Sequence, residues 1–297
     1  MSCLSSTAPI NIDPEKQSGV CDLKCNYQFR YSDSISTATN RGDYLSINYE
    51  PSSTSAPVRF NSYEYTVSEI RIYTPSLHSF RGHKTVGECI VVHTSNTGNS
   101  PLLVCVPILA GNSATAASQY LSTVIQTMSK TAPVDGDATL VNASFNLDAF
   151  VPSKPFFSYT GTQPYQPCQG ENHYVVFLPT DSAIHISSDD VETLSAVIEK
   201  NAYTVSTMEP SFYFNADGPS HSFGSSDDIY IDCQPVGESE ETVDVMTSES
   251  EATPNIFQGD MLKFILICLL FILLLYVFNY FLTYLGGKVG NRGTATL

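Results

Sequence analysis

The sequence predicts a mainly β fold of the α+β class with a few helices, followed by a single C-terminal transmembrane helix. Two observations indicate the β-structure. The chain has 17 Tyr and 16 Phe residues beside many Val, Ile and Thr residues, and these residue types favour strands. Short apolar or alternating runs are separated by turn-forming residues. A third observation indicates the membrane helix, because residues 264–285 form one long apolar run.

Five runs have the length and the pattern of strands. Each alternates between apolar and polar residues or is continuously apolar, and each is bounded by Gly, Pro, Ser or Asn. These predicted strands are residues 44–50, 64–74, 88–94, 102–109 and 175–179.

Two segments of the same region have helical patterns. Residues 116–130 carry apolar side chains at helical spacing and form the clearest predicted helix. Residues 187–200 begin with Ser187 as the expected N-cap, continue with acidic residues in the first turn, and end with Lys200 in the expected last turn.

The apolar run 264–285 is long enough to cross a membrane. Its 22 residues span about 33 Å as a helix, which matches the hydrocarbon thickness of a bilayer. With the preceding residues it gives a predicted transmembrane helix over 261–285, followed by a short basic tail, 286–297, that contains Lys288 and Arg292. A buried core helix of this length would show a polar stripe, and this run has none.

An acidic segment precedes the predicted span. Residues 237–251 contain six acidic residues and no basic residue, and such a composition buries too little apolar surface to offset the entropy of ordering. We therefore predict a flexible tether over 236–260. Residues 1–235 are long enough to form one sizeable domain.

The topology depends on how the span is inserted. The first residues show no basic region followed by an apolar run, so we expect no secretory signal peptide. Insertion after synthesis would leave the domain on the cytosolic face of a host membrane. The basic tail points the other way under the positive-inside rule, but only Lys288 and Arg292 contribute to it. We expect the cytosolic orientation.

The charge of the domain limits its partners. Residues 1–235 hold 11 basic and 23 acidic residues, which gives a net charge of −12. A surface of this sign repels polyanions, so the sequence argues against nucleic acid as a partner.

The cysteines leave two questions open. Cys21 and Cys25 form a CxxxC pair, but no second pair lies at the spacing of a zinc site, which argues against a Cys-ligated metal. Residues 1–235 hold seven cysteines. A cytosolic route favours free thiols, and one or two disulfides formed late remain an alternative.

Five motifs in the same order resemble segments of the α-class carbonic anhydrases. They are APINID at 8–13, NRG at 40–42, the paired runs EIRIYT and GECIVVHT at 69–74 and 87–94 with SLHSF between them at 76–80, NLDAFVPSKPFFSYTGT at 146–162, and VVFLPTDSAIHISSDDVETL at 175–194. The resemblance covers residues 8–235. It implies a large, twisted, mostly antiparallel central sheet with a few peripheral helices.

The same resemblance assigns the positions of the family's three zinc-binding histidines. Two of these fall on Arg71 and Tyr73, and the third falls on Ile90. The proton-shuttling histidine falls on Asp43, and the threonine that orients the zinc-bound hydroxide falls on Pro164. The resemblance therefore implies a pseudoenzyme with no catalytic residues and no metal or other cofactor.

Other family residues are retained. His78, Glu88 and His93 stand where the family has His, Glu and His, and we interpret them as a buried hydrogen-bond network. Arg71 has two interpretations. It fills the vacated pocket by pairing with Glu88, or it receives an anionic ligand there.

A carbonic-anhydrase-like domain without zinc ligands on a C-terminal anchor also resembles the envelope adsorption proteins of poxvirus particles. This resemblance implies a protein of a virion membrane, in a large DNA virus, that attaches to a protein or glycan of the host surface. Arg59, Arg71, Arg81 and Lys84 are the candidate ligand contacts. The alternative is a minor structural protein that tethers a capsid shell to an internal membrane. An active carbonic anhydrase is the third and least favoured interpretation.

Overall fold

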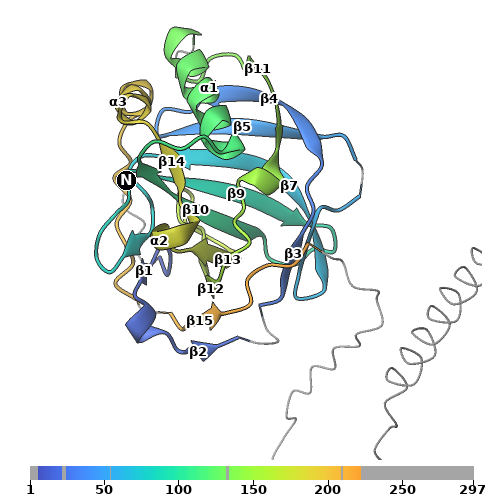
Figure 1. The fold of residues 1–297 in the computed structure, drawn as a ribbon. Coiled ribbons are helices and arrows are strands. Elements are labelled where there is room, and N and C mark those ends of the chain that lie inside the picture. Colours follow the sequence, from blue (N-terminus) through green and yellow to red (C-terminus); the bar gives the residue numbers. More distant parts are fainter. Residues whose placement is uncertain (1–5, 22–24, 54, 132–133, 209, 222–297) are drawn as a thin grey trace, which may run out of the picture. The chain divides into compact units, whose positions relative to one another are not determined.

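A mixed β-sheet of thirteen strands forms the framework of the computed structural model, which describes residues 6–21, 25–53, 55–131, 134–208 and 210–221 (Figure 1). The main path of the sheet runs in the order β11-β4-β5-β7-β9-β10-β13-β12-β15-β2, and β3, β6 and β14 join it at the side. These strands are β2 (Gly19–Val20), β3 (Tyr27–Phe29), β4 (Asp33–Asn40), β5 (Tyr44–Pro51), β6 (Val58–Phe60), β7 (Tyr63–Tyr73), β9 (Gly87–Ser95), β10 (Leu102–Ala110), β11 (Thr139–Asn146), β12 (Phe156–Thr162), β13 (Glu171–Phe177), β14 (Ile184–Ile186) and β15 (Phe212–Asn215).

Most neighbouring strands are antiparallel, as the sequence predicted. Within this sheet, the parallel pairs are β10 with β13, β10 with β14, and β15 with β2. Two further short strands, β1 (Asn11–Ile12) and β8 (Ser79–Phe80), form a separate parallel pair. The sheet is therefore mixed.

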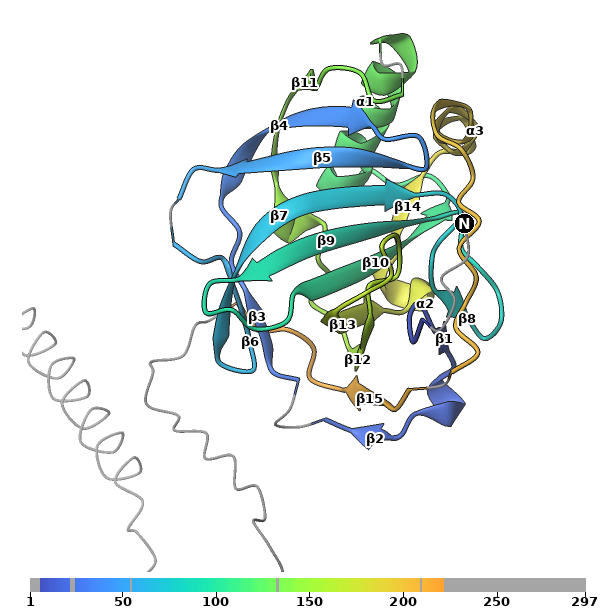
Figure 2. The ribbon, with the colours of Figure 1, turned by 180° about the vertical axis from the view of Figure 1, so that it is seen from behind.

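Within the described part of the chain, helices are few and lie outside the sheet. They are α1 (Ala116–Thr131), α2 (Pro179–Ser182) and α3 (Ser188–Val197), together with the short 3-10 helices η1 (Pro14–Lys16) and η2 (Leu147–Ala149). Figure 1 shows α1 and α3 at the same end of the sheet, and α1 contacts α3, β11, β4 and β14. Figure 2 shows β4, β5, β7 and β9 from the other side, where no helix covers them.

The period of two along each strand divides the core into two clusters, one on each face of the sheet. On β5, Leu45 and Ile47 point into the larger cluster, which also contains the apolar side of α1. On β10, Leu103 and Cys105 point into the smaller cluster, which is rich in tyrosine and phenylalanine. A residue's position in its strand therefore decides which cluster it joins.

Helix α1 confirms the predicted helix 116–130 almost residue for residue. Its buried side chains recur at intervals of three and four residues, so they form one stripe that packs on the larger cluster. They are Ala117, Tyr120, Leu121, Val124, Ile125 and Met128.

Helix α3 begins as predicted but ends earlier. The Ser187 hydroxyl accepts a hydrogen bond from the Asp190 backbone N–H at 3.1 Å, which is the N-cap that the sequence indicated. The helix ends at Val197 because Ile198 is extended and buried, and the Glu199 N–H then bonds to the Gly42 carbonyl at 2.7 Å. Lys200 therefore lies beyond the last turn, contrary to the prediction.

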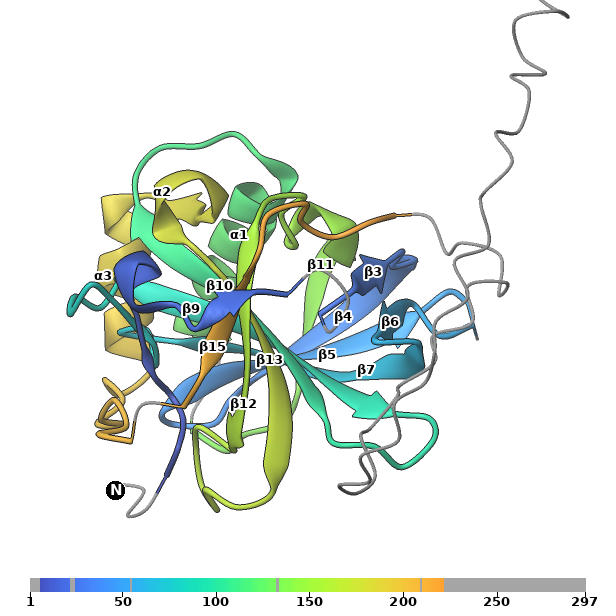
Figure 3. The ribbon, with the colours of Figure 1, turned by 90° about the horizontal axis from the view of Figure 1, so that it is seen from below.

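The two ends of the described chain meet in the sheet. Tyr213 and Phe214 of β15 pair with Gly19 and Val20 of β2, and Figure 3 shows these two strands side by side. Farther along, the Ser220 carbonyl accepts a hydrogen bond from the Phe29 N–H at 3.0 Å. The C-terminal segment thus contacts both β2 and β3 of the N-terminal segment.

The C-terminal predictions lie outside the described residues. These are the tether 236–260, the transmembrane helix 261–285 and the tail 286–297. Among the residues that the structure describes, no helix is long and apolar enough to cross a membrane.

Candidate functional site

The register of β7 and β9 brings the three predicted ligand positions onto one face of the sheet. Arg71 and Tyr73 are two residues apart on β7, so their side chains point to the same side. Ile90 on β9 is the cross-strand partner of Arg71 and shares this face. This face carries the smaller, aromatic cluster.

Arg71 is held by a carboxylate and three tyrosines, which we call the Arg71 cluster. Its Nε donates to Glu69 Oε2 at 2.6 Å, and its Nη1 donates to the Tyr73 hydroxyl at 3.3 Å. The guanidinium carbon lies 4.5 Å from the ring centre of Tyr44 and 4.0 Å from that of Tyr165. These are cation–π distances.

The partner of Arg71 differs from the predicted one. The sequence suggested Glu88, whereas the ion pair forms with Glu69. Glu69 stands two residues before Arg71 on β7, so the two side chains share a face. Glu88 is engaged elsewhere, with His78.

The charged groups of the Arg71 cluster are mostly shielded from solvent. The side chain of Arg71 is 18 % exposed and that of Glu69 is 22 % exposed. Burial alone would lower the pKa of Arg71, but the neighbouring Tyr165, Tyr73 and Glu69 raise it overall, so the guanidinium stays protonated. Burial raises the pKa of Tyr165 to about 12. The cluster is therefore a fixed cation–carboxylate pair among neutral phenols.

A polar rim surrounds this cluster. The Tyr203 hydroxyl donates to Asp43 Oδ2 at 3.2 Å, and its ring meets that of Tyr73 edge-on at 6.5 Å. The Ser46 hydroxyl donates to the second oxygen of Glu69. Each acidic group at the rim thus accepts a hydrogen bond from a neighbour.

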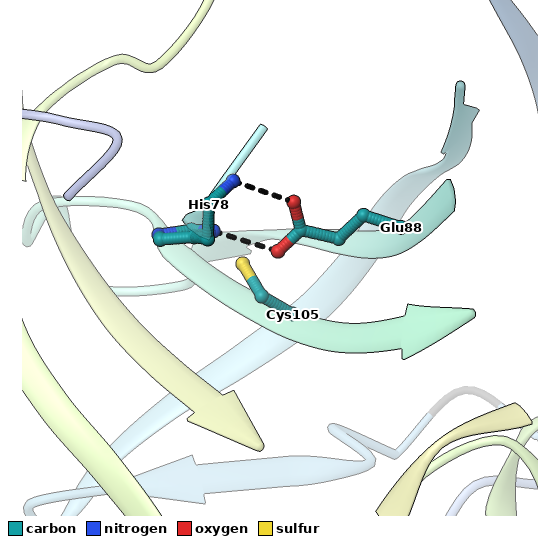
Figure 4. Close-up of side chains that lie close together, drawn as sticks. All are labelled: His78, Glu88 and Cys105. Atoms are coloured by element: carbon teal, nitrogen blue, oxygen red, sulfur yellow. Dashed lines mark hydrogen bonds and ion pairs between the residues drawn. The ribbon is translucent and has the colours of Figure 1, made fainter. Parts of the chain in front are cut away.

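A second polar cluster on the same face is fully buried (Figure 4). We call it the His78 cluster; it consists of His78, Glu88, Tyr159 and Cys105. Glu88 Oε2 accepts hydrogen bonds from the backbone N–H groups of Leu77 and His78 at 2.7 and 3.0 Å, and its Oε1 lies 2.6 Å from His78 Nδ1. His78 Nε2 lies 2.7 Å from the Tyr159 hydroxyl.

Both ring nitrogens of His78 have a hydrogen-bond partner. Nδ1 contacts the Glu88 carboxyl group, and Nε2 contacts the Tyr159 hydroxyl. Burial raises the pKa of the Cys105 thiol far above its usual value, and the nearby Glu88 carboxylate raises it further. Cys105 is therefore a protonated, unreactive thiol.

The His78 cluster contains atoms that could bind a metal ion, but the distances between these atoms are those of hydrogen bonds. Ligand atoms of His78, Glu88 and Cys105 all lie within 4.8 Å of one another. Two ligands about 2 Å from a tetrahedral zinc ion would stand about 3.3 Å apart, whereas His78 Nδ1 and Glu88 Oε1 are 2.6 Å apart. This arrangement suits a shared proton better than a metal ion.

His93 belongs to a separate network on the other face of the sheet. Its Nδ1 donates to the Leu102 carbonyl at 3.1 Å, and its Nε2 accepts from the Tyr31 hydroxyl at 2.8 Å. The Tyr31 hydroxyl also lies 3.0 Å from that of Tyr27. Burial lowers the pKa of His93 to about 4, so the ring is neutral at physiological pH. The three retained residues thus form two networks rather than one.

The four predicted contact residues do not form one basic group. Arg59 pairs with Glu64 at 3.0 Å, and Arg81 pairs with Glu15 at 3.3 Å. Arg59 lies on β6 and Arg81 directly follows β8, and Figure 2 shows these two strands on opposite sides of the domain.

Lys84, the remaining predicted contact, is also engaged. Its ammonium group donates to the Tyr203 carbonyl at 2.8 Å. Burial lowers its pKa. Arg59, Arg81 and Lys84 are thus each bound to an acceptor of the chain itself.

Sequence reasoning missed Tyr44, Glu69 and Tyr165. Glu69 stands two residues before Arg71, so the strand period could have indicated it. Tyr44 is opposite Tyr73 on β5, which becomes visible only once the strand pairing is known. Tyr165 comes from the connection between β12 and β13 and has no local signal.

The cysteines show both states that the sequence left open. Cys21 and Cys25 form a disulfide, and Cys168 is also disulfide-bonded. Cys89 and Cys105 are buried free thiols. The CxxxC pair is thus a cross-link between the end of β2 and the start of β3.

Comparison with known proteins gives one family and one fold. Residues 3–212 match the model of the eukaryotic-type carbonic anhydrases. No curated protein matches the sequence.

Solved carbonic anhydrases and one further protein share the fold. The α-carbonic anhydrase of Photobacterium profundum is 17 % identical with a TM-score of 0.58, and the match covers 71 % of this chain and 88 % of that chain. Dioscorin, solved in complex with ascorbate, is 16 % identical with a TM-score of 0.56 over 71 % and 86 %. The Thermovibrio ammonificans enzyme, solved with sulfanilamide, is 14 % identical with a TM-score of 0.57 over 71 % and 86 %.

Proposed function

The chain belongs to the eukaryotic-type carbonic anhydrase family, and we propose that it is a non-catalytic member that serves recognition at the surface of a virus particle. The proposal has two parts. The first is the loss of the reaction, and the second is the use of the domain as a membrane-anchored binding module. Each part has its own support and its own test.

The Arg71 cluster carries the first part. Zinc in a catalytic site needs three neutral or anionic donor atoms and an open position for water. The three positions instead hold a protonated guanidinium, a phenol whose pKa is raised by burial, and an alkyl chain, namely Arg71, Tyr73 and Ile90. These residues do not fit zinc, because a fixed cation repels the metal and Ile90 offers no donor atom.

Two further positions support the same conclusion. Asp43, at the position of the proton-shuttling histidine, accepts a hydrogen bond from Tyr203 and cannot relay protons near neutral pH as an imidazole does. Pro164 is buried and has no hydroxyl group with which to orient a nucleophile. We therefore assign no residue of this chain a catalytic role.

The second part rests on the sequence and on charge. The apolar run 264–285 supports a membrane anchor, and the resemblance to the poxvirus adsorption proteins supports a place in a virion membrane with the domain outside the bilayer. The net charge of −12 over residues 1–235 and the ion pairs of Arg59, Arg71 and Arg81 argue against a sulfated glycan. A protein surface or a neutral glycan is the better partner.

The loss of the reaction is tested on the purified full chain in detergent. We expect no stoichiometric zinc by elemental analysis and no CO₂ hydration above background by stopped-flow assay. One tightly bound equivalent of zinc, together with activity that a chelator abolishes, would contradict this part of the proposal.

The partner class is tested on a heparin column. We expect the full chain to elute at or below about 150 mM salt, because the domain repels a polyanion at long range. Retention beyond about 300 mM salt would favour a sulfated glycan instead. Immunogold labelling of intact particles should find the domain outside; labelling that appears only after capsid removal would favour the capsid-tethering alternative.

A further inference from the structure

The face of β4 and β5 opposite α1 carries exposed side chains that the proposed function does not yet use. Figure 2 shows these two strands without a helix over them. Their side chains on this face alternate with the buried residues of the larger cluster. On β4 they are Asp33, Ile35, Thr37 and Thr39, and on β5 they are Tyr44, Ser46, Asn48 and Glu50.

Two large apolar side chains stand exposed on this face. Ile35 is 64 % exposed and Leu140 is 60 % exposed. Leu140 on β11 pairs with Thr37, so it lies on the same face as Ile35 and diagonal to it across two adjacent strands. Their backbone neighbours Ser36 and Val141 are buried on the opposite face. The strand period therefore fixes both apolar side chains outward.

Carboxylates border this apolar pair. Glu50 is the cross-strand partner of Ile35, and its Oε1 accepts a hydrogen bond from Asn48 at 3.0 Å. Asp33 begins β4 two residues before Ile35 and accepts from Asn146 at 3.1 Å. None of the eight positions that β4 and β5 turn to this face is basic. We call Ile35, Leu140, Glu50 and Asp33 the β4–β11 patch.

We propose that the β4–β11 patch is the docking surface for a protein partner that presents an apolar side chain beside lysine or arginine. This inference rests on the proposed recognition function and names the surface that performs it. An apolar centre with a polar, charged rim is the arrangement of protein interfaces. Charge complementarity selects the partner, because the acidic rim attracts a basic surface and repels an acidic one.

The same charges make other occupants poorer matches. A second copy would bring Asp33 and Glu50 against identical carboxylates if the patch met itself, and both copies are acidic overall. A sulfated glycan would meet repulsion at the rim. A basic protein surface is therefore the partner that fits the patch.

The test selects peptides on the full chain. The chain is placed in nanodiscs of phosphatidylcholine, and a phage-displayed library of random peptides is enriched on it after removal of binders to empty nanodiscs. We expect the enriched peptides to carry lysine or arginine next to an aliphatic or aromatic residue. Their affinity should fall as salt rises from about 50 to about 300 mM, because screening weakens the charge term.

Matched variants locate the binding. The double variant Ile35→Ser with Leu140→Ser should weaken binding of a selected peptide about tenfold or more, and Glu50→Lys should weaken it as well. The control is Val20→Ser with Tyr213→Ser on β2 and β15, whose side chains are 54 % and 41 % exposed. This control should change the affinity less than about twofold. Thermal unfolding of each variant confirms that the domain is intact.

Three outcomes would overturn the inference. The library enriches nothing or enriches acidic peptides; the control pair weakens binding as much as the patch pair; or light scattering shows a dimer that the patch variants dissociate. Binding of the same nanodiscs to host cells tests recognition separately. Wild-type binding that the patch variants retain would leave the proposed function standing and would refute this surface.

Discussion

The His78 cluster and the Arg71 cluster lie on the same face of one sheet, yet they are built on opposite principles. In the His78 cluster, Glu88 and His78 are fully buried and are hydrogen-bonded to each other and to the backbone. In the Arg71 cluster, Arg71 and Glu69 keep about a fifth of their side-chain surface in contact with solvent. One is a sealed network and the other is an ion pair with a solvent-facing side.

The difference teaches where such a fold tolerates change. A sealed network loses several hydrogen bonds when one member is replaced, and its remaining groups cannot turn to water. A pair that keeps some contact with solvent can be rehydrated after a replacement, so the cost is smaller. We therefore expect replacements to cost less stability at Arg71 than at Glu88.

The largest expected effect comes from opening the sealed network. Glu88→Ala removes the hydrogen-bond partner of the Leu77 N–H, the His78 N–H and His78 Nδ1 at a fully buried site. We expect the free energy of unfolding to fall by about 4 kcal/mol. Urea unfolding of the full chain in detergent measures it, with tyrosine fluorescence as the signal because the chain has no tryptophan.

A conservative replacement is the control. Glu88→Gln keeps a carbonyl oxygen for the backbone donors but turns an amide group toward His78, so we expect about half of that loss. Equal losses for the two variants would mean that side-chain shape, rather than the acceptors, holds the cluster together.

The next effect is a dependence of stability on pH caused by His93, which also lies in a sealed network. The folded-state pKa is lowered from 6.5 to about 4, so the unfolded chain binds a proton more readily than the folded chain. This contribution is complete above pH 6.5 and is lost as the pH falls from 6.5 toward 4. The loss amounts to about 3 kcal/mol. Unfolding midpoints measured across this pH range reveal it.

His93→Gln isolates the contribution. Glutamine can still donate to the Leu102 carbonyl and accept from the Tyr31 hydroxyl, but it does not titrate. The variant should therefore show a flatter stability profile between pH 6.5 and 4. A profile as steep as that of the wild type would assign the pH dependence to the carboxylates instead.

A smaller effect is expected from the Arg71 cluster. Arg71→Met keeps the length of the side chain but removes the charge, so Glu69 loses its partner and retains its hydrogen bond from Ser46. Because Glu69 reaches solvent, we expect a loss of about 1 kcal/mol. The same urea titration measures it. A loss as large as that of Glu88→Ala would remove the distinction between the two clusters.

The smallest effect belongs to a fully exposed pair. Arg81 and Glu15 are 64 % and 80 % exposed, so water already solvates both groups. Arg81→Ala should change the free energy of unfolding by less than about 0.5 kcal/mol. A larger change would show that Arg81 also stabilises the turn after β8. An Arg81→Lys variant would then restore only part of the lost stability.

The sequence predicted several of the long, periodic elements, but not the eight-residue strands β4 and β11. The predicted elements are long enough for an alternating or helical pattern of apolar residues to be distinguished from a random sequence. They are strands β5, β7, β9 and β10 and helix α1. The short strands β3, β6 and β15 were not predicted, because three or four residues carry little pattern and their conformation depends on the neighbouring strands. The motifs supplied the order of the elements, and the family match confirms that part of the resemblance.

The candidate site could be predicted only where spacing along one strand determines it. The shared face of Arg71 and Tyr73 follows from their separation by two residues. Glu69 shares that face for the same reason, but Glu88 is unavailable to Arg71 because it pairs with His78, a contact that the sequence pattern does not reveal. The contact with Tyr165 depends on a connection more than ninety positions away in the chain. Long-range packing of this kind is the part that the sequence pattern lacks.

The pairing of β2 with β15 sets the order in which the domain can be assembled during synthesis. Residues 19–20 leave the ribosome early, but their partners at 213–214 are made nearly two hundred residues later. Strand β2 therefore stays unpaired until β15 has been synthesised. The entropy cost of closing so long a loop slows folding. Nascent chains stopped before residue 213 should therefore bind chaperones that recognise exposed strands, and longer chains should be released from them.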